Sequence, residues 1–467
     1  MRGLFHPHQI ETEFSIPPNA LDRSTTSAML GRLLRRRAEI VATPNQSLSE
    51  RPPIEWTPSG VSNPRRWTIV GLLFSATVIN YLDRGTLSVA LPMIARELSL
   101  TAFQKGLLLW SFFTFYSVMQ IPVGWLVDRL DLRWFYAGMF TLWCVSCGLM
   151  GLAGSLITLI ALRVLLGVGE SIFLAGGNRI VSALFPPMDR GLPTGLFDSG
   201  TRVGLAVGTP IIAWLILRFG WRSMFSLVGF GSLIWLIPWF IVYPTRDGFA
   251  KPVSAPTQPS GQPGKRHWIT FNRDLVGLCL GFMCFGYNWF LLVTWLPDYL
   301  MQVRHLSVMN AGFSAAIPFL VYAVGEPLGG WIADRLVHRG WDETLTRKGI
   351  VTFAFAMGLL LIPATQAKTA STAILFIAGA SLVGLSSANL LVILQRCAPP
   401  DEIGAWTGMQ NGIGNFGGIS ALVTGILISR TGSYVPGFVL GPVVLMAGLL
   451  AYWLIVGKLR PAQAGSD

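Results

Sequence analysis

The chain alternates between apolar runs of about 20 residues and short polar connections, from Trp67 almost to its C-terminus. About 20 apolar residues in a helix cross the hydrocarbon core of a bilayer. A single segment in lipid satisfies its backbone hydrogen bonds only as a helix, and the sequence lacks the alternating pattern of a membrane barrel. The pattern therefore predicts an all-α membrane protein with twelve transmembrane helices, at residues 67–90, 104–127, 134–155, 157–180, 193–217, 222–243, 274–300, 309–333, 348–366, 370–395, 404–429 and 433–457.

Basic residues concentrate in the connections that follow the even-numbered helices. These are Arg129, Arg133, Arg190, Arg246, Lys251, Lys265, Arg266, Arg273, Arg335, Arg339, Arg347, Lys348 and Arg396. Connections rich in Lys and Arg remain in the cytoplasm. An even number of helices places both termini on one side, so we expect both termini to be cytoplasmic.

Three segments lie outside the helices. Residues 1–66 are rich in Pro, Ser and Arg and are expected to form a disordered cytoplasmic tail; an organelle transit segment or a basic patch on anionic lipid remain alternatives. Residues 244–273 are expected to be a flexible cytoplasmic linker between a six-helix half at 67–243 and another at 274–458. Residues 459–467 form a short C-terminal tail.

A repeated motif supports the division into halves. Gly124-Trp-Leu-Val-Asp128-Arg129 recurs 206 residues later as Gly330-Trp-Ile-Ala-Asp334-Arg335. Transporters with internally repeated halves bind substrate near the midplane, between the halves.

Composition narrows the class further. Of 467 residues, 52% are hydrophobic and 12% are charged, against about a quarter charged in soluble proteins. This excludes soluble enzymes, nucleic-acid binders and secreted scaffolds, and topology explains the net charge of +12 better than a nucleic-acid partner does. Cys144-x-x-Cys147 lies in an apolar run without a second such pair or a nearby His, so we expect packing and no metal site. All five His lie outside the runs or at their edges, which leaves carboxylates for any proton chemistry within the membrane.

A few ionisable residues lie inside predicted helices, where each costs several kcal/mol and is a functional candidate. Arg163 and Glu170 are seven residues apart and share one helix face, and Asp83 lies at a similar depth on helix 1. If Arg163 is shared between Glu170 and an anion, protonation of Glu170 frees the guanidinium, and proton and anion bind cooperatively. The alternative is that these residues are salt-bridged braces between helices.

Several motifs carry a family resemblance. The sequence GWLVDRLDLR and its copy GWIADRLVHRG resemble the loop motif of the major facilitator superfamily. A more specific set is similar to the anion:cation symporter branch, which includes permeases for sugar acids and phthalate-type aromatic acids. This set comprises Asn80-Tyr-Leu-Asp83-Arg84, Tyr116 with Gln120–Trp125, Leu162-Arg163 through Glu170, Asn178-Arg179 through Phe185-Pro186, Asp189-Arg190-Gly191 and Trp295–Tyr299.

The resemblance implies roles for individual residues. In that family the acids that match Asp83 and Glu170 couple protons, and the arginines that match Arg84 and Arg163 serve substrate binding and charge balance. Tyr116 falls where sugar-acid carriers place a substrate-contacting tyrosine; a simple aromatic packing role is the alternative. Protons are the coupling ion, and no cofactor is expected.

Helix 11 and helix 5 add further candidates. Asn411 is the best second-half substrate contact, amid glycines that permit close helix approach. On helix 5, Thr201 stands where sugar-acid carriers tend to have Gln, and Arg202 either neutralises Asp198 at i,i+4 or binds the anion. Glu326 is an unexpected acid in helix 8 that is either an extra protonation site or the partner of a polar group.

Asp128 and Arg129, with Asp334 and Arg335, lie at cytoplasmic helix ends. We expect them to latch helices together in the outward-facing state, through ion pairs and the N-terminal dipole of a neighbouring helix. Breaking the latch should alter the conformational equilibrium and leave the affinity of the site unchanged.

The sequence thus favours a proton-coupled symporter of an organic carboxylate, a sugar acid or an aromatic acid, that works by alternating access. Antiport or efflux of an organic anion on the same fold is the main alternative, and a non-transporting membrane sensor is a weaker one. An enzyme is not expected, because the helices hold no nucleophile–base pair or metal set. We expect a monomer in the inner membrane of a bacterium, with a small organic anion, protons and the lipid bilayer as its partners.

Overall fold

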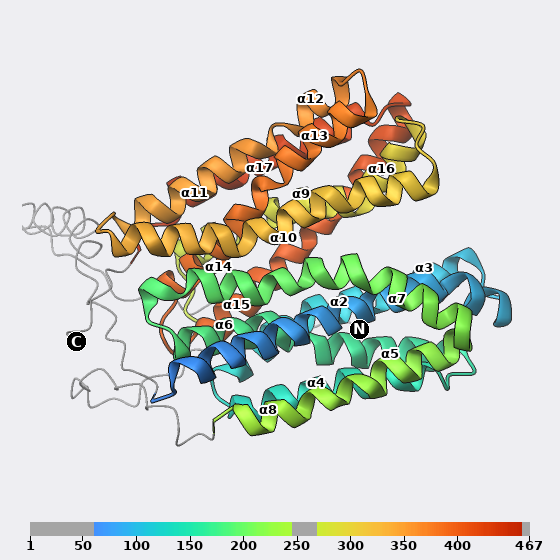
Figure 1. The fold of residues 1–467 in the computed structure, drawn as a ribbon, viewed down its shortest axis with the longest axis horizontal. Coiled ribbons are helices and arrows are strands. Elements are labelled where there is room, and N and C mark those ends of the chain that lie inside the picture. The colour runs from blue at the N-terminus through green and yellow to red at the C-terminus, as the bar shows by residue number, and fades with distance from the viewer. Residues whose placement is uncertain (1–59, 245–268, 460–467) are drawn as a thin grey trace, which may run out of the picture. The chain divides into compact units, whose positions relative to one another are not determined.

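The computed structural model describes residues 60–244 and 269–459, whose regular elements are all helices (Figure 1). The N-terminal group of helices comprises α2 (Asn63–Glu97), α3 (Ala102–Val127), α4 (Leu132–Met150), α5 (Leu156–Glu170), α6 (Ile172–Leu184), η1 (Pro187–Asp189), α7 (Gly191–Ser232), η2 (Leu233–Trp235) and α8 (Leu236–Val242). The C-terminal group comprises α9 (Arg273–Gln302), α10 (Val308–His338), α11 (Glu343–Gly358), α12 (Leu361–Gln366), α13 (Ala370–Ala380), η4 (Ser381–Val383), α14 (Gly384–Cys397), α15 (Ile403–Gly414), η5 (Asn415–Gly418), α16 (Ile419–Thr431) and α17 (Val435–Leu454). Most of the predicted tails and linker lies outside the described residues.

Eight helical segments of the described chain are long and apolar enough to cross a membrane. They are Leu156–Leu184, Pro210–Val242, Arg273–Gln302, Phe313–His338, Glu343–Gln366, Ala370–Cys397, Ile403–Thr431 and Val435–Ile455. The other four predicted spans, at 67–90, 104–127, 134–155 and 193–217, are also helical over most of their length. Two of these carry charged pairs, in α2 and in the first part of α7, and such pairs lower mean hydropathy.

Helix ends follow local sequence signals. Thr101 and Gln104 form a reciprocal capping box at the start of α3, and Ser155 caps α5 by accepting a hydrogen bond from a backbone N–H. Gly220, with φ of 81°, breaks α7 between the two predicted spans, because a left-handed backbone favours glycine. At the N-terminus, α2 begins at Asn63, four residues before the predicted boundary at 67. Pro at an early helix position supports that start.

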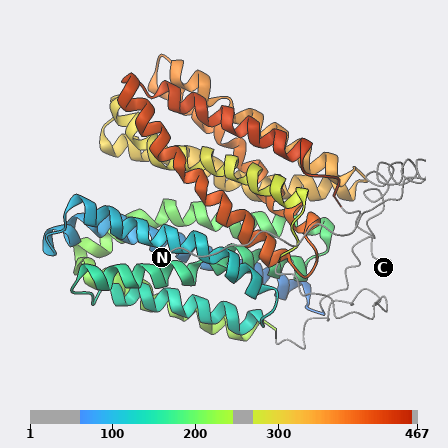
Figure 2. The same ribbon diagram turned by 180° about the vertical axis from the view of Figure 1, so that it is seen from behind.

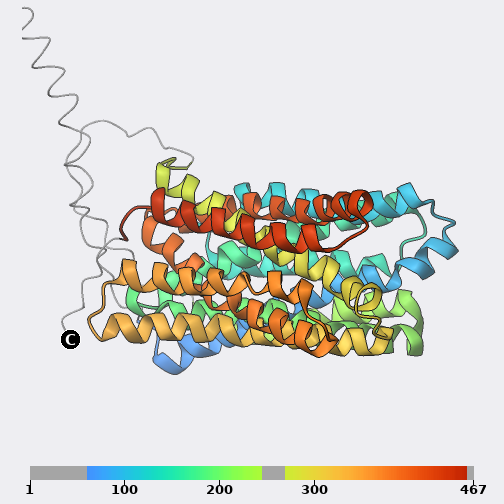
Figure 3. The ribbon, with the colours of Figure 1, turned by 90° about the horizontal axis from the view of Figure 1, so that it is seen from above.

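The two groups of helices each have their own apolar interior. The largest buried cluster lies almost wholly within the N-terminal group, and two further clusters lie in the C-terminal group. Figures 1 and 2 show the groups as neighbouring bundles, and in Figure 3 their helices run along one common direction. The groups meet mainly where α7 packs on α10 and where α3 packs on α15.

The contact between α3 and α15 depends on small residues. A side chain at Gly124 would meet the backbone of Gly404 and Gly408. Glycine permits this close approach of two helices, as at many helix contacts in membranes.

Glu97 ties the far end of α2 to α7. Its carboxylate accepts hydrogen bonds from Arg222 at 2.7 Å and from the Trp221 indole at 2.8 Å. The hydrogen bond from Arg222, followed by that from Trp221, lowers the pKa of Glu97.

Candidate functional site

An ion pair joins α2 to the end of α5. Arg84 Nε lies 3.0 Å from Glu170 Oε2, and the Glu170 side chain is fully buried. The Arg84 guanidinium also lies over the rings of Tyr81 and Tyr116, at 4.6 and 4.3 Å from their centroids. The helix is interrupted directly after Glu170, where α5 gives way to α6. The structure therefore pairs Glu170 with Arg84, whereas the spacing along the chain had suggested Arg163.

Arg163 is a buried cation whose hydrogen-bonding capacity is not used. Its side chain is 2% exposed, it lies 4.5 Å from the Phe112 ring centroid, and within the described chain its Nε and Nη1 atoms have no hydrogen-bond partner. Asp83 is fully buried nearby and interacts electrostatically with Glu170 and Arg163. Its Oδ1 accepts a weak hydrogen bond from the Cys147 thiol at 3.7 Å. The four predicted residues of this first charge cluster, Asp83, Arg84, Arg163 and Glu170, are thus brought together.

A small cavity lies beside this cluster, between the two groups of helices. Its volume is about 60 Å³, and Tyr81, Tyr116, Arg202 and Asn411 are among its lining residues. A water molecule occupies about 30 Å³ and ligand sites span roughly 300–1,000 Å³, so this conformation has room for water but not for an organic acid. The Arg84 guanidinium lies behind the aromatic wall, against Tyr81 and Tyr116.

The predicted residues of helix 5 lie on α7 and face the C-terminal group. Arg202 Nη1 donates a hydrogen bond to the Thr201 hydroxyl at 2.5 Å, and its Nη2 lies 2.9 Å from Glu326 Oε1 of α10. Asp198 accepts a hydrogen bond from Ser387 of α14 at 3.0 Å. Spacing along the helix had suggested Asp198 as the partner of Arg202, but the closer carboxylate belongs to Glu326.

Asp128 binds the N-terminus of a helix in the other group. Its carboxylate accepts hydrogen bonds from the backbone N–H groups of Gly404 and Ala405, at 2.9 and 2.8 Å, and Arg179 Nε lies 3.4 Å away. Burial raises the pKa of Asp128 to about 6, although Arg179 and the two N–H groups act in the opposite direction. At neutral pH the carboxylate is therefore mostly ionised and accepts both hydrogen bonds.

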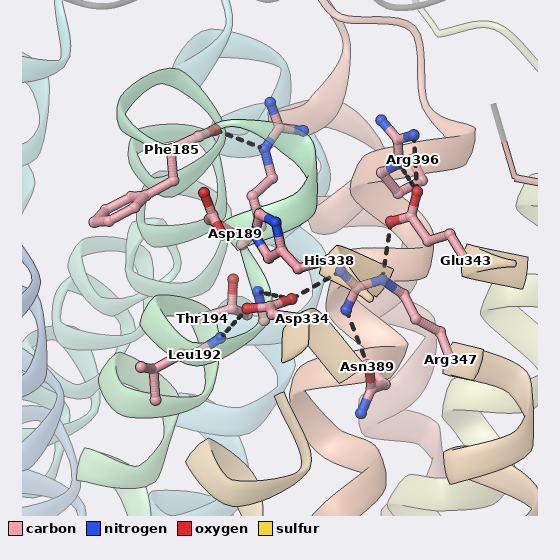
Figure 4. Close-up of polar contacts among 12 residues, drawn as sticks. Phe185, Asp189, Leu192, Thr194, Asp334, His338, Glu343, Arg347, Asn389 and Arg396 are labelled. Carbon is pink, nitrogen blue, oxygen red and sulfur yellow. Dashed lines mark hydrogen bonds and ion pairs between the residues drawn. The ribbon is translucent and has the colours of Figure 1, made fainter. Parts of the chain in front are cut away.

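Asp334 makes the equivalent contact in the reverse direction, from α10 to the N-terminus of α7. Its oxygens accept hydrogen bonds from the N–H groups of Gly191 at 3.1 Å and Leu192 at 2.9 Å. Arg347 Nη2 lies 2.9 Å from the same carboxylate (Figure 4). Each copy of the repeated motif thus supplies one acid to a helix N-terminus of the opposite group, where the first N–H groups have no partner within the helix.

The arginines that follow these acids do not make the cross-contacts. Arg129 donates a hydrogen bond to the Trp125 carbonyl of its own helix at 2.9 Å, and Arg335 is exposed and lines a cavity of about 600 Å³. Arg179 and Arg347 contact the two acids instead. Arg179 stood in a motif of the sequence without an assigned role.

Figure 4 shows further polar residues that sequence reasoning missed. Arg347 lies between Asp334 and Glu343, and Glu343 in turn pairs with Arg396 at 2.9 Å. Asp189 pairs with His338 across the two groups of helices. Glu343 and Arg347 stand at i,i+4, a detectable pair, but the contacts between helices depend on tertiary structure.

Among the described residues, the polar contacts between the two groups lie toward one end of the helices, which we call the basic end. This end is defined by Asp128, Arg190, Asp334, Arg347 and Arg396. Within the described residues, the cross-contacts extend from this end only as far as Asp198–Ser387 and Arg202–Glu326. The groups are therefore closed against one another at the basic end.

No group of three or more His, Cys, Asp or Glu in the residues that the structure describes is placed to hold a metal ion. Cys144 and Cys147 are buried free thiols within the apolar cluster of the N-terminal group.

Comparison with known proteins bears on the family. The family model of the Major Facilitator Superfamily matches residues 73–422. A D-galactonate transporter of Escherichia coli O6:H1 is 31% identical over 419 residues, which cover 85% of this chain and 96% of that protein. A probable L-galactonate transporter of Escherichia coli K12 is 32% identical over 408 residues, which cover 83% of this chain and 89% of that protein.

A solved structure shows the same fold at low sequence identity. The fucose:proton symporter FucP of Escherichia coli superposes with a TM-score of 0.64 and 14% identity, covering 84% of this chain and all of that one. This likeness extends to the fold alone.

Proposed function

The chain belongs to the Major Facilitator Superfamily, and from this premise we propose that it carries a small organic carboxylate, a sugar acid or an aromatic acid, together with protons by alternating access. The relatives named above are a D-galactonate transporter and a probable L-galactonate transporter, and because galactonate is a sugar acid they support the substrate class. Thr201 stands where sugar-acid carriers tend to have Gln, and Arg202 offers a further contact for an anion. Together with the aromatic residues that line the cavity, these differences support an aromatic acid as the alternative substrate.

One observation carries the proposal: Arg163 is a buried guanidinium with unused donors, next to a carboxylate already paired elsewhere. A buried guanidinium without hydrogen-bond acceptors is costly, and a bound carboxylate would supply the missing acceptors. An anion-binding role explains why such an arrangement is retained.

Coupling to protons follows from the charge of the first cluster. Two acids and two arginines balance, so a bound anion adds one uncompensated negative charge. Protonation of Glu170 would remove that charge and release Arg84 toward the substrate. We therefore assign the released guanidinium to Arg84 and the unpaired one to Arg163. Asp83 is the second candidate proton carrier.

Two contacts would complete the substrate site. Tyr116 lines the cavity and touches Arg84, so its ring lies between the cavity and the first cluster. Asn411 lines the opposite wall from the C-terminal group and offers an amide to a hydroxyl or carboxylate. A substrate held by Tyr116 and Asn411 would bridge the two groups.

The membrane arrangement that fits this function has twelve spans in two six-helix halves, with both termini in the cytoplasm. The basic residues of alternate connections support this orientation. The basic end is then cytoplasmic, and closure there makes the described conformation outward-facing. Release of the Asp128 and Asp334 contacts would open the opposite, inward-facing state. The bacterial source of the relatives supports a bacterial inner membrane, and we propose a monomer that needs no cofactor.

The test begins with binding and continues with transport. A thermal-shift screen of sugar acids, aromatic acids and dicarboxylates identifies compounds that stabilise the native protein. Each stabilising acid is then offered to proteoliposomes of the full chain, with the outside made acidic. We expect the gradient to drive accumulation and alkalinisation outside.

The variants decide the coupling assignment. Glu170→Gln should abolish gradient-driven accumulation and retain exchange of internal for external acid. Glu97→Gln, at the outer end of α2, is the matched control and should transport like the wild type. If accumulation of the acid by the wild type does not depend on the pH gradient, symport is contradicted and the antiport alternative is favoured. If Glu170→Gln still accumulates the acid in response to the gradient, the assignment of Glu170 as the proton-coupling residue is contradicted.

A further inference from the structure

A second charged cluster lies where α7, α10 and α14 meet. Asp198 and Arg202 come from α7, Glu326 from α10 and Ser387 from α14. The three charged side chains are 7%, 5% and 0% exposed respectively. Arg202 Nη2 lies 2.9 Å from Glu326 Oε1, and Ser387 donates a hydrogen bond to Asp198.

The charges of this cluster do not balance. Two carboxyl groups share one guanidinium, and the other groups facing Glu326 are neutral: Tyr322 on its own helix and Ser387 of α14. Tyr81 of α2 faces Arg202 from the N-terminal group. Within the described chain Glu326 Oε2 has no hydrogen-bond partner, and Oε1 has only the ion pair with Arg202; Arg202 Nε also lacks a hydrogen-bond partner. A buried site with excess negative charge and unused acceptors favours the uptake of a proton.

Arg202 and Glu326 lie at different distances from the cavity. Arg202 lines the cavity, and its Cζ lies 3.8 Å from the centroid of the Trp289 ring, whereas Glu326 is not among the residues that line the cavity. Arg202 therefore lies between the cavity and Glu326. An anion in the cavity that binds Arg202 competes with Glu326 for the same guanidinium.

We propose that Glu326 is an additional proton-binding residue of the transport cycle, which takes up a proton as Arg202 turns from Glu326 to the organic anion. One proton enters with one negative charge, so the net charge of the cluster is unchanged. The competition makes proton and anion binding mutually favourable, as linkage requires. This inference rests on the proposed function and adds a second coupling site to that of Glu170.

The position of the pair links it to the conformational change. Glu326 belongs to the C-terminal group and Arg202 to the N-terminal group. Among the polar contacts between the two groups in the described residues, their contact is one of the two that lie farthest from the basic end. Separation of the groups at that end would draw the two residues apart and admit water to Glu326, which favours release of the proton to that side.

The first experiment measures protonation without any substrate. Infrared difference spectra of the reconstituted full chain, recorded during a pH titration, resolve the carbonyl band of protonated carboxyl groups. We expect a band component that disappears in Glu326→Gln and returns, shifted, in Glu326→Asp. Glu97→Gln, the matched control, should keep it. Loss of the folded state in Glu326→Gln would show as a lowered melting temperature, and Glu326→Asp then carries the test alone. A full band in Glu326→Gln, or no shift in Glu326→Asp, overturns the proposal.

The second experiment counts protons in transport. With the membrane potential held at zero, the logarithm of the anion accumulation ratio rises linearly with the pH difference, and the slope is the number of protons per anion. D-galactonate is the first probe. Glu326→Gln should lower the slope by one, and an unchanged slope overturns the inference. If the wild type shows no gradient-driven uptake of any acid from the screen, the proposed function fails while the infrared band still decides whether Glu326 binds a proton.

Discussion

Replacement of Asp334 by Asn should loosen the closed end of the molecule by a predictable amount. The carboxylate accepts two backbone hydrogen bonds, from Gly191 and Leu192, and asparagine retains one acceptor oxygen for them. A hydrogen bond to a charged group contributes about 1.5–3 kcal/mol. Arg347 also loses its ion pair with Asp334, but it keeps Glu343 at 3.0 Å. Because these residues all belong to the C-terminal group, the bonds lost between the two groups are those at the N-terminus of α7. We expect a cost of about 2 kcal/mol, which is roughly a 30-fold shift toward the open conformation.

Hydrogen–deuterium exchange measures this shift at the amides concerned. Gly191 and Leu192 stand at the start of α7, where N–H groups lack partners within the helix, so their protection depends on Asp334. Asp334→Asn should raise their exchange rate about 30-fold. If the two groups of helices move as rigid bodies, the amides of Gly404 and Ala405, which Asp128 binds, should also exchange faster. Arg335→Gln changes the exposed neighbour and should leave the rates unchanged. Equal rates in Asp334→Asn and the wild type would refute the latch.

Further substitutions test packing, charge and pH dependence. Gly404→Ala places a Cβ against the backbone of α3 and should lower the free energy of unfolding by about 1–3 kcal/mol. Gly71→Ala, where the added Cβ would meet open space, is the control and should leave that free energy unchanged. Thermal unfolding compares the two variants. Arg84→Gln leaves the buried Glu170 carboxylate without its ion pair and should lower the free energy of unfolding by about 3–5 kcal/mol. Arg163→Gln breaks no ion pair, so it should lower the free energy of unfolding far less and should abolish stabilisation by the ligand. Similar losses of stability in the two variants contradict the assignment. The pKa of Glu97 is lowered in the folded protein. Its ionised carboxylate therefore stabilises the protein fully above the ordinary pKa of about 4.3, and this stabilisation is lost as the pH falls through the lowered pKa. A series of melting temperatures at decreasing pH should show this loss in the wild type and not in Glu97→Gln.

The positions of the helices could be predicted from the sequence because apolar length and flanking charge act locally. Each predicted span falls on helix, and the predicted gap between 217 and 222 contains the break at Gly220. The helices extend beyond the apolar runs at some ends, as α2 does to Glu97, because a helix continues into water where capping and propensity allow.

The ion-pair partners could not be predicted in the same way. Spacing along one helix states which side chains share a face, but it does not state how neighbouring helices are rotated toward that face. Arg163 and Glu170 share a face as expected, yet Glu170 pairs with Arg84 of another helix. Arg202 likewise pairs with Glu326 across the two groups. Both partners were already candidates; the pairing itself depends on tertiary packing.

The two clusters together predict how transport responds to membrane potential. The first cluster holds two acids and two arginines, and the second holds two acids and one arginine, so the seven side chains carry one excess negative charge when all are ionised. A bound monocarboxylate raises the excess to two, and two protons restore neutrality, one at each cluster. The complex of two protons and one anion then carries one positive charge into the cell, and an inside-negative potential should accelerate uptake.

This response isolates the contribution of the second cluster. In Glu326→Gln one proton and one anion move together, so uptake should become insensitive to a potassium diffusion potential while it still follows the pH gradient through Glu170. The Glu97→Gln control should remain sensitive. If Glu326→Gln proteoliposomes respond to the potential as strongly as the wild type does, the second cluster moves no charge, and the excess carboxylate must be neutralised by a proton that stays in place throughout the cycle.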